Sequence, residues 1–416
     1  MSVIRGDAAK PSRREPRRSL PADARLLLAC AARGPDPGAI ETALDVDDAW
    51  SGLVERAVRH RLGPLVYATL RAASEAGAVR PPDALMTRLR AIYDRHALRA
   101  ARRIAKLAAI GPALEGAGIP IIVLKGAALG PALFGDPALR TMGDVDLLVR
   151  RDQQEAAGRV LLAQGYVADL SGGSEAWYHT RHHHSVPLRS PDGFLIVELH
   201  HTIAEQGEAR VPVEELWTRS RRQPIGDVPF SVLAAEDLLL HLCLHLAGNN
   251  RVADGMLRDL RDVAQLIRHE GAALDWGAVV EQARAWRMAG YAYWTLWLAH
   301  EMVGADVPSA VLDRLMEDRR SGRSARLLRR LLPELLLAST PWPFRLPPWL
   351  MAGAVPLLLH TDEPAHIGAL AHRASRAGRM TLDHARRSWW VARAARRLLG
   401  RRENPPSPDL QLGTRL

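Results

Sequence analysis

Hydrophobic residues recur at helical spacing along both flanks of the chain, over residues 21–118 and 231–339. The middle differs: IPIIVL (119–124) and DVDLLV (144–149) are short, β-branched apolar runs typical of buried strands. The pattern predicts an α+β protein that is mostly helical. A small central mixed sheet is expected between N- and C-terminal helical regions.

The central segment predicts strand, helix, strand, helix, strand and strand over residues 119–203. Lys125-Gly126 turns the first strand into a short helix, and a second helix is expected from near Asp152 to Gly165. The runs 177–190 and 194–203 are expected to form a hairpin. The predicted division is a disordered basic tail (1–20), an N-terminal helical region (21–118), the α/β core (119–230), a second helical region (231–339), a basic helical region (340–402) and a disordered tail (403–416).

The net charge of +10 lies at the ends of the chain. Residues 1–20 carry net +4 and residues 371–402 net +9, so the remainder is net −3. Contact with nucleic acid is therefore expected only through these basic ends, and solvated ends are the simpler interpretation. Cys30 and Cys243 sit in apolar helical patterns and are expected to be buried thiols. No signal peptide or membrane span is predicted, which favours a cytoplasmic protein.

Two acidic residues interrupt the second predicted strand. Residues two apart in a strand share a face, so Asp144 and Asp146 point the same way, with Val145 and Leu147 opposite. Neighbouring carboxylates raise each other's pKa, and a divalent cation removes that repulsion. An Asp-x-Asp that merely ends a strand in water is the alternative. Glu198, in the apolar run 194–203, supplies a third carboxylate and favours the metal interpretation.

The stretch LKGAALGPALFGDPALRTMGDVDLLV (124–149) resembles the uncharacterised nucleotidyltransferase family, within the DNA polymerase β-like superfamily. The matching features are Lys125-Gly126, the run from Asp136 to Arg140, and residues 143–146. Flanking resemblance extends over residues 45–70, 258–269 and 275–283. The similarity covers roughly residues 21–315.

The resemblance implies a metal-dependent transfer of a nucleoside monophosphate from an NTP, with ATP the expected nucleotide, to an unknown acceptor. Asp144, Asp146 and Glu198 would bind Mg²⁺ (or Mn²⁺), and Glu198 could instead act as base. Lys125, Gly126 and Arg140 are the candidates for phosphate binding. Where the superfamily has serine after the glycine, this chain has Ala127. A degenerate module that only binds nucleotide or a partner is therefore the alternative.

Several histidines and helical acids are weaker candidates. At most two of His182, His183 and His184 can reach one ion, because consecutive strand residues face opposite ways. His200 shares the face of Glu198 and could support it. His241 and His245 are expected in the core. Asp259 and Asp262 would face either an acceptor pocket or solvent. The oligomeric state is left open.

Overall fold

The computed structural model describes residues 20–32, 37–44, 49–172, 183–205, 208–249 and 257–317, with five further positions between 329 and 337. The predicted tail at 1–20, apart from Leu20, the predicted tail at 403–416 and the predicted basic helical region at 340–402 lie outside the described residues. His182 lies outside them as well. Within the described part of the chain the protein is mostly helical around one mixed sheet, which confirms the predicted α+β class.

The sheet has the strand order β3-β4-β5-β2-β1-β7-β6. Its strands are β1 (Ile122–Val123), β2 (Val145–Leu148), β3 (Val167–Ala168), β4 (Leu188–Arg189), β5 (Ile196–His200), β6 (Arg221–Ile225) and β7 (Val228–Val232). The pairs β2–β5 and β1–β7 are parallel, and the other neighbouring pairs are antiparallel. The strands predicted at 119–124, 144–149 and 194–203 correspond to β1, β2 and β5, which lie next to one another in the middle of the sheet.

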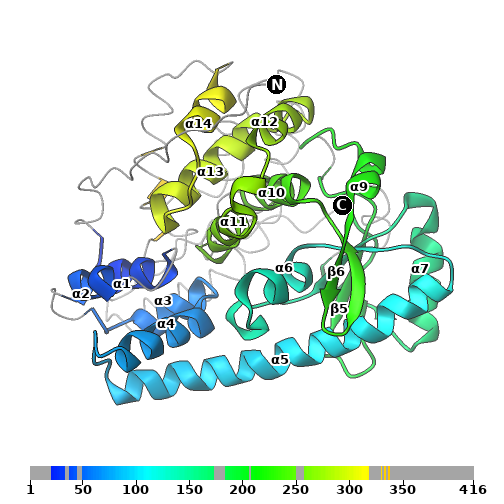
Figure 1. The fold of residues 1–416 in the computed structure, drawn as a ribbon. Coiled ribbons are helices and arrows are strands. Elements are labelled where there is room, and N and C mark those ends of the chain that lie inside the picture. The colour runs from blue at the N-terminus through cyan, green and yellow to red at the C-terminus, as the bar shows by residue number, and fades with distance from the viewer. Residues whose placement is uncertain are drawn as a thin grey trace, which may run out of the picture.

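Helices cover both faces of this sheet (Figure 1). The N-terminal helices are α1 (Ala22–Ala31), α2 (Pro37–Leu44), α3 (Leu53–Arg59), α4 (Gly63–Glu75) and α5 (Asp83–Gly116). Within and beside the sheet unit lie α6 (Lys125–Phe134), α7 (Gln154–Ala163) and α9 (Val213–Arg219). The C-terminal helices are α10 (Ala235–Cys243), α11 (Leu257–Glu270), α12 (Trp276–Ala285), α13 (Ala289–Val303) and α14 (Ser309–Met316).

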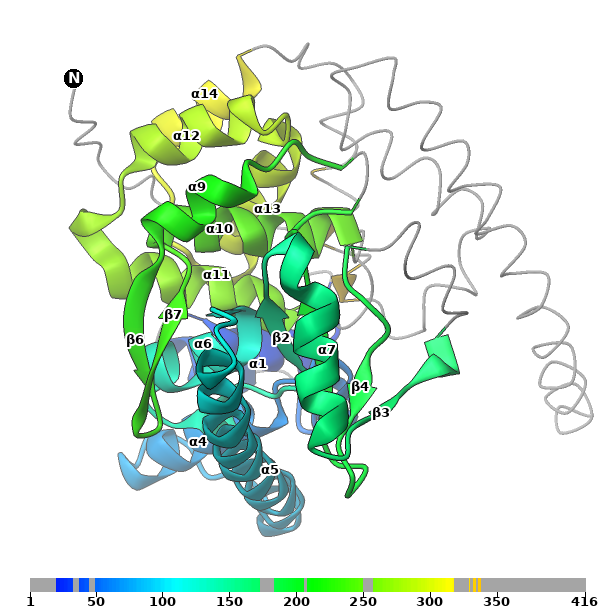
Figure 2. The same ribbon diagram turned by 90° about the vertical axis from the view of Figure 1, so that its right-hand side faces the viewer.

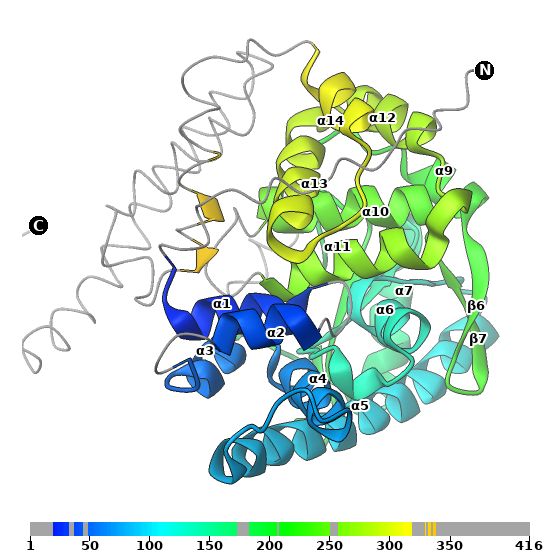
Figure 3. The ribbon, with the colours of Figure 1, turned by 60° about the vertical axis from the view of Figure 1, so that its left-hand side comes forward.

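The apolar side chains gather into two clusters, one on each side of the sheet. On one side, α5 and α7 pack against Val145, Leu147 and Val197, and Figure 2 shows α5 nearly end-on beside α7. On the other side, α1–α4 and α10–α14 share a single cluster that includes Leu148. Figure 3 shows α1–α4 lying beside α11 and α13. The two helical flanks, distant in sequence, thus enclose one face of the sheet together.

Three local features of the structure do not follow from the pattern of the sequence. A hairpin of β6 and β7 was not predicted, because each strand contains a proline, Pro224 and Pro229, and Pro is disfavoured in strands. It turns through Gly226 at φ 61°. The helical pattern over 49–73 divides into α3 and α4, with Arg61 between them at φ 57°. The helix that begins at Lys125 continues through Pro131 to Phe134, although a proline is unfavourable inside a helix.

Both cysteines are buried, as expected. Among the described residues, no helix combines the length and the apolar character that crossing a membrane requires.

Candidate active site

Parallel pairing of β2 with β5 brings two of the predicted carboxylates together. In the register of these strands Asp146 lies directly opposite Glu198. Val145, Leu147 and Val197 alternate with them and pack on the α5–α7 side, so the two carboxylates face the enclosed side of the sheet. Asp146 is buried, whereas Glu198 is half-buried. The strand alternation inferred from the sequence is therefore confirmed.

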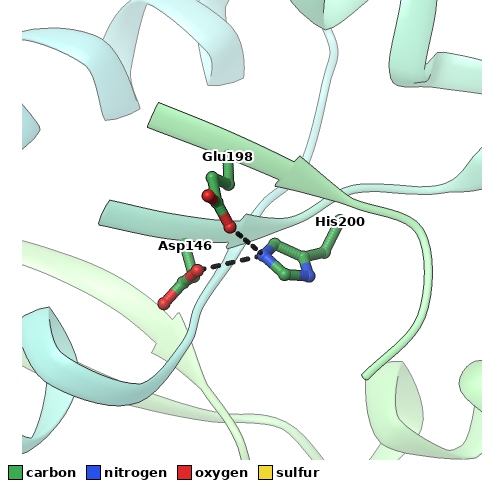
Figure 4. Close-up of side chains that lie close together, drawn as sticks. All are labelled: Asp146, Glu198 and His200. Atoms are coloured by element: carbon green, nitrogen blue, oxygen red, sulfur yellow. Dashed lines mark hydrogen bonds and ion pairs between the residues drawn. The ribbon is translucent and has the colours of Figure 1, made fainter. Parts of the chain in front are cut away.

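His200, the last residue of β5, connects the two carboxylates (Figure 4). Its Nε2 lies 3.0 Å from Asp146 Oδ1 and 3.4 Å from Glu198 Oε2. The three residues offer ligand atoms that all lie within 4.8 Å of one another. Burial lowers the pKa of His200, but the hydrogen bonds to Asp146 and Glu198 outweigh burial and raise it overall. Because carboxylate oxygens only accept, Nε2 of His200 carries a proton and donates to Asp146, with Glu198 Oε2 also nearby.

Lys125 contacts the same oxygen of Asp146 as His200 does. It follows β1 and opens α6 with a positive φ of 43°, a conformation that few residues other than glycine adopt. Its Nζ lies 3.5 Å from Asp146 Oδ1, and the side chain is buried. Burial raises the pKa of Asp146, yet the Lys125 ammonium and the His200 hydrogen bond hold that pKa well below its usual range. Asp146 is thus ionised at neutral pH.

Asp144 stands just before β2, beyond Gly143, and is exposed. The nearby Asp146 carboxylate raises the pKa of Asp144 to about 6. The protein packed around this solvent-accessible carboxyl group reduces its solvation and, together with Glu198, adds to this rise. The Arg103 guanidinium, from α5, donates to the Gly143 carbonyl at 3.3 Å and holds the loop. Asp146 and Glu198 both oppose the ionisation of Asp144, so the surroundings of Asp144 carry an excess of negative charge.

Arg140 is bound to α11. Its Nε and Nη2 lie 2.9 and 2.8 Å from Asp262 Oδ2, and both side chains are buried. A Cβ added to Gly126 would lie 2.2 Å from Arg140 Nη1, so only glycine leaves room for the guanidinium against the Lys125-Gly126 turn. In this structure, the group that packs closely against the backbone of Gly126 is therefore the Arg140 guanidinium.

The segment of α11 that resembles the family, residues 258–269, directs its two aspartates to the interior. Asp259 and Asp262 are both buried, so of the two alternatives the solvated helix face is wrong. Arg258 donates to Asp259 Oδ1 and to the Thr141 carbonyl, which joins α11 to the loop before β2. His241 is buried, as expected of a core histidine. Burial lowers its pKa well below the usual value, and the Lys125 charge adds to this effect.

The sequence did not single out Arg61, which lies between α3 and α4. The Thr141 hydroxyl donates to its carbonyl at 3.0 Å, so the turn is tied to the loop before Asp144. Partial desolvation and Arg258 lower the pKa of Arg61, whereas Asp259 and Asp144 act in the opposite sense. Its guanidinium therefore lies within electrostatic reach of Asp144, and no local pattern distinguishes it from the many other arginines.

His184 approaches the site from the strand segment before β4. It bridges to His200 in antiparallel register, and its Nε2 lies 3.4 Å from Glu198 Oε2. The rings of His183, His184 and His200 lie within 5.0 Å of one another by their centroids. The histidine run thus places His184 against the third carboxylate.

Residues 47–304 match a family model described as "Uncharacterised nucleotidyltransferase". The chain belongs to this family. The match contains every candidate site residue and confirms the resemblance inferred from the sequence. A transferase is the activity that the family name states.

Other comparisons add little to this assignment. Among curated proteins, none matches the chain. A solved structure, the solution structure of the antibiotic-resistance factor ANT(2'')-Ia, is similar over 44% of this chain and 98% of its own length. The identity is 13% and the TM-score is 0.28, too low for this likeness to bear on function. The nucleotidyltransferase assignment rests on the family.

Proposed function

We propose that this protein transfers a nucleoside monophosphate from an NTP, with ATP as the expected nucleotide, to a hydroxyl of an acceptor molecule. The acceptor oxygen forms a bond to the α-phosphorus, the bond to the β-phosphate oxygen breaks, and pyrophosphate leaves. The observation that carries the proposal is the placement of Asp146 directly opposite Glu198, with ligand oxygens of both within 4.8 Å of each other.

The donor set fits a divalent cation. Asp146 and Glu198 offer ligand oxygens within 4.8 Å of each other and of His200 Nε2, and oxygen ligands of this kind suit Mg²⁺ or Mn²⁺. Asp144 lies two residues before Asp146 and would add a third carboxylate. We assign Asp144, Asp146 and Glu198 as the metal ligands. When bound, the ion would offset charge on the phosphate and favour ionisation of the acceptor hydroxyl.

The phosphates are proposed to lie at the start of α6. No side chain caps the first turn of this helix in the described structure, so its amide N–H groups and its dipole favour an anion there. Lys125 adds a full positive charge at the same turn. Arg140 packs over Gly126 and brings a second cation, partly neutralised by Asp262. These groups would hold the triphosphate and stabilise the leaving pyrophosphate.

A proton must leave the acceptor hydroxyl during the transfer. Glu198 is half-buried, and the hydrogen bond from His200 lowers its pKa although burial opposes this. It is ionised at neutral pH and is proposed either to hold the ion or to accept this proton. The enclosing helices α4, α10 and α11 would then form the acceptor side of the site.

The test is pyrophosphate release from each labelled NTP with Mg²⁺ or Mn²⁺, alone and with cell lysate as a source of acceptors. Asp144→Asn and Asp146→Asn are expected to abolish release, whereas Asp227→Asn, an exposed acid in the β6–β7 turn, serves as the matched control. Equal turnover in all four proteins would overturn the proposal.

One observation favours the second candidate, a nucleotide-binding module without turnover. Residue 127, where the superfamily pattern has serine, is an alanine, so this position offers no hydroxyl to a phosphate. Ala127 is buried in the apolar cluster that contains α5 and α7. Nucleotide binding that is tight, but without metal-dependent pyrophosphate release for any NTP or acceptor fraction, would support that candidate over the transferase.

A further inference from the structure

One side of α5 carries an excess of positive charge. The helix holds seven lysine or arginine residues and three acidic residues, an excess that is hidden when charge is summed over the whole middle of the chain. Arg95, Arg99 and Arg103 follow one another at intervals of four residues, so they lie along one side of the helix and form an arginine stripe. At a rise of 1.5 Å per residue this arginine stripe is about 12 Å long.

The arginine stripe ends beside the exposed carboxylate of the candidate site. Arg103 is buried and donates to the Gly143 carbonyl at 3.3 Å, next to Asp144 in the chain. Arg61, from the turn between α3 and α4, lies within electrostatic reach of the same Asp144 carboxylate. Asp144 is exposed. Arginines from two separate elements therefore lie near the solvent-accessible end of the site.

The outer two arginines of the stripe have no acid to pair with. Arg95 and Arg99 are exposed, and among the residues that the structure describes neither has a hydrogen-bond or ion-pair partner. Burial lowers the pKa of the neighbouring His96, and the charges of Arg99, Arg103 and Arg95 lower it further. The positive charge of Arg95 and Arg99 is therefore available to an anionic ligand.

The triphosphate of the NTP does not account for the whole stripe. It is proposed to lie at the start of α6, against Lys125 and Arg140, whereas Arg95 lies about 12 Å along α5 from Arg103. One strand of nucleic acid carries a phosphate about every 3.4 Å, so roughly three phosphates span this length. Guanidinium groups bind phosphate oxygens in bidentate geometry. A regular row of arginines fits such a backbone better than it fits the irregularly spaced carboxylates of an acidic protein.

We propose that the acceptor is the end of a single-stranded nucleic acid, whose backbone lies along the arginine stripe and whose terminal hydroxyl reaches Asp144 and Asp146. A single strand is favoured because one row of arginines follows one backbone and because Asp146 is buried. The proposal rests on the proposed function, since this hydroxyl is the acceptor. Its oxygen bonds to the α-phosphorus, its proton passes to Glu198 or to water, and pyrophosphate leaves, so the strand gains one nucleotide.

Binding of a labelled single-stranded RNA to the full chain, and of the DNA with the same base sequence, tests the surface without any NTP. Fluorescence anisotropy over a range of salt concentrations gives the slope of log Kd against log salt. Each phosphate contact on a single strand adds about 0.7 to this slope. Arg95→Gln/Arg99→Gln is therefore expected to lower the slope by about 1.4 for the probe that is the acceptor. Equal slopes in this variant and the wild type for both probes overturn the proposal.

Arg90→Gln/Arg159→Gln is the matched control, because it removes the same charge from exposed positions away from the stripe. Arg90 lies on the other side of α5, 3.7 Å from Asp94, and Arg159 lies on α7. The slope of this variant should equal that of the wild type. An equal fall in both double variants overturns the assignment to the stripe. The basic ends of the chain are the same in all three proteins, so their contribution to binding cancels in the comparison.

The product of transfer separates this inference from the proposed function. With labelled NTP, Mg²⁺ and cell lysate, the labelled product is expected to be degraded by nuclease and to resist protease. Degradation by ribonuclease alone assigns RNA, and degradation by deoxyribonuclease alone assigns DNA. Label that resists both nucleases overturns the acceptor assignment and leaves the proposed transfer intact. Absence of pyrophosphate release with every acceptor overturns the proposed function and the acceptor assignment together.

Discussion

Replacement of Gly126 by alanine is expected to destabilise the protein, although alanine is the better helix former. The added Cβ would lie 2.2 Å from Arg140 Nη1 and 3.0 Å from Met142 Cγ. The guanidinium would have to move by roughly 1 Å, and overpacking of this kind costs about 1–3 kcal/mol. Arg140 cannot swing into solvent without losing its 2.9 Å hydrogen bond and its 2.8 Å ion-pair contact with the buried Asp262.

Gly130→Ala is the matched control, because it lies on the same helix and its added Cβ has no neighbour nearer than 3.9 Å. It should be neutral or stabilising by up to about 1 kcal/mol, the usual gain from glycine to alanine within a helix. Urea unfolding of both variants and the wild type measures the difference. Equal free energies of unfolding for Gly126→Ala and Gly130→Ala would refute the argument that Arg140 packs on the Gly126 turn.

Three further predictions concern charge. Mg²⁺ should raise the melting temperature of the wild type but less that of Asp146→Asn, as measured by calorimetry; an equal rise would count against Asp146 as a ligand. Because the pKa of Asp144 is raised to about 6, metal affinity measured by titration should fall as the pH drops below about 6, where Asp144 is protonated, and stay level above it; a flat profile from pH 5 to 8 contradicts this. His60 is fully buried, and burial, then Arg56, lowers its pKa to about 4. The unfolded chain binds the proton first, so stability is present above pH 6.5 and is lost toward pH 4, by up to about 3 kcal/mol. Urea midpoints of His60→Leu should fall less over this range, and parallel losses in both proteins would argue against His60.

The local chemistry of the site followed from the sequence because it depends on short-range rules. Strand alternation placed Asp144 and Asp146 on the face opposite Val145 and Leu147, and Glu198 stood out as an acid in an apolar run. The helical flanks followed from apolar periodicity. The β6–β7 hairpin did not, because its prolines oppose strand propensity and it is held in the sheet by the long-range pairing of β7 with β1.

Only the tertiary structure decided which side chains contact one another in the site. Parallel pairing of β2 with β5 sets Asp146 against Glu198 across 52 positions of sequence, and no local pattern fixes such a register. Asp262 becomes the partner of Arg140 because α11 packs beside α6, and His184 reaches Glu198 because its segment bridges to His200. The sequence by itself determined which residue types and strand faces carry the chemistry. Their convergence required the long-range packing that encloses one face of the sheet, because contacts between distant segments depend on the whole fold.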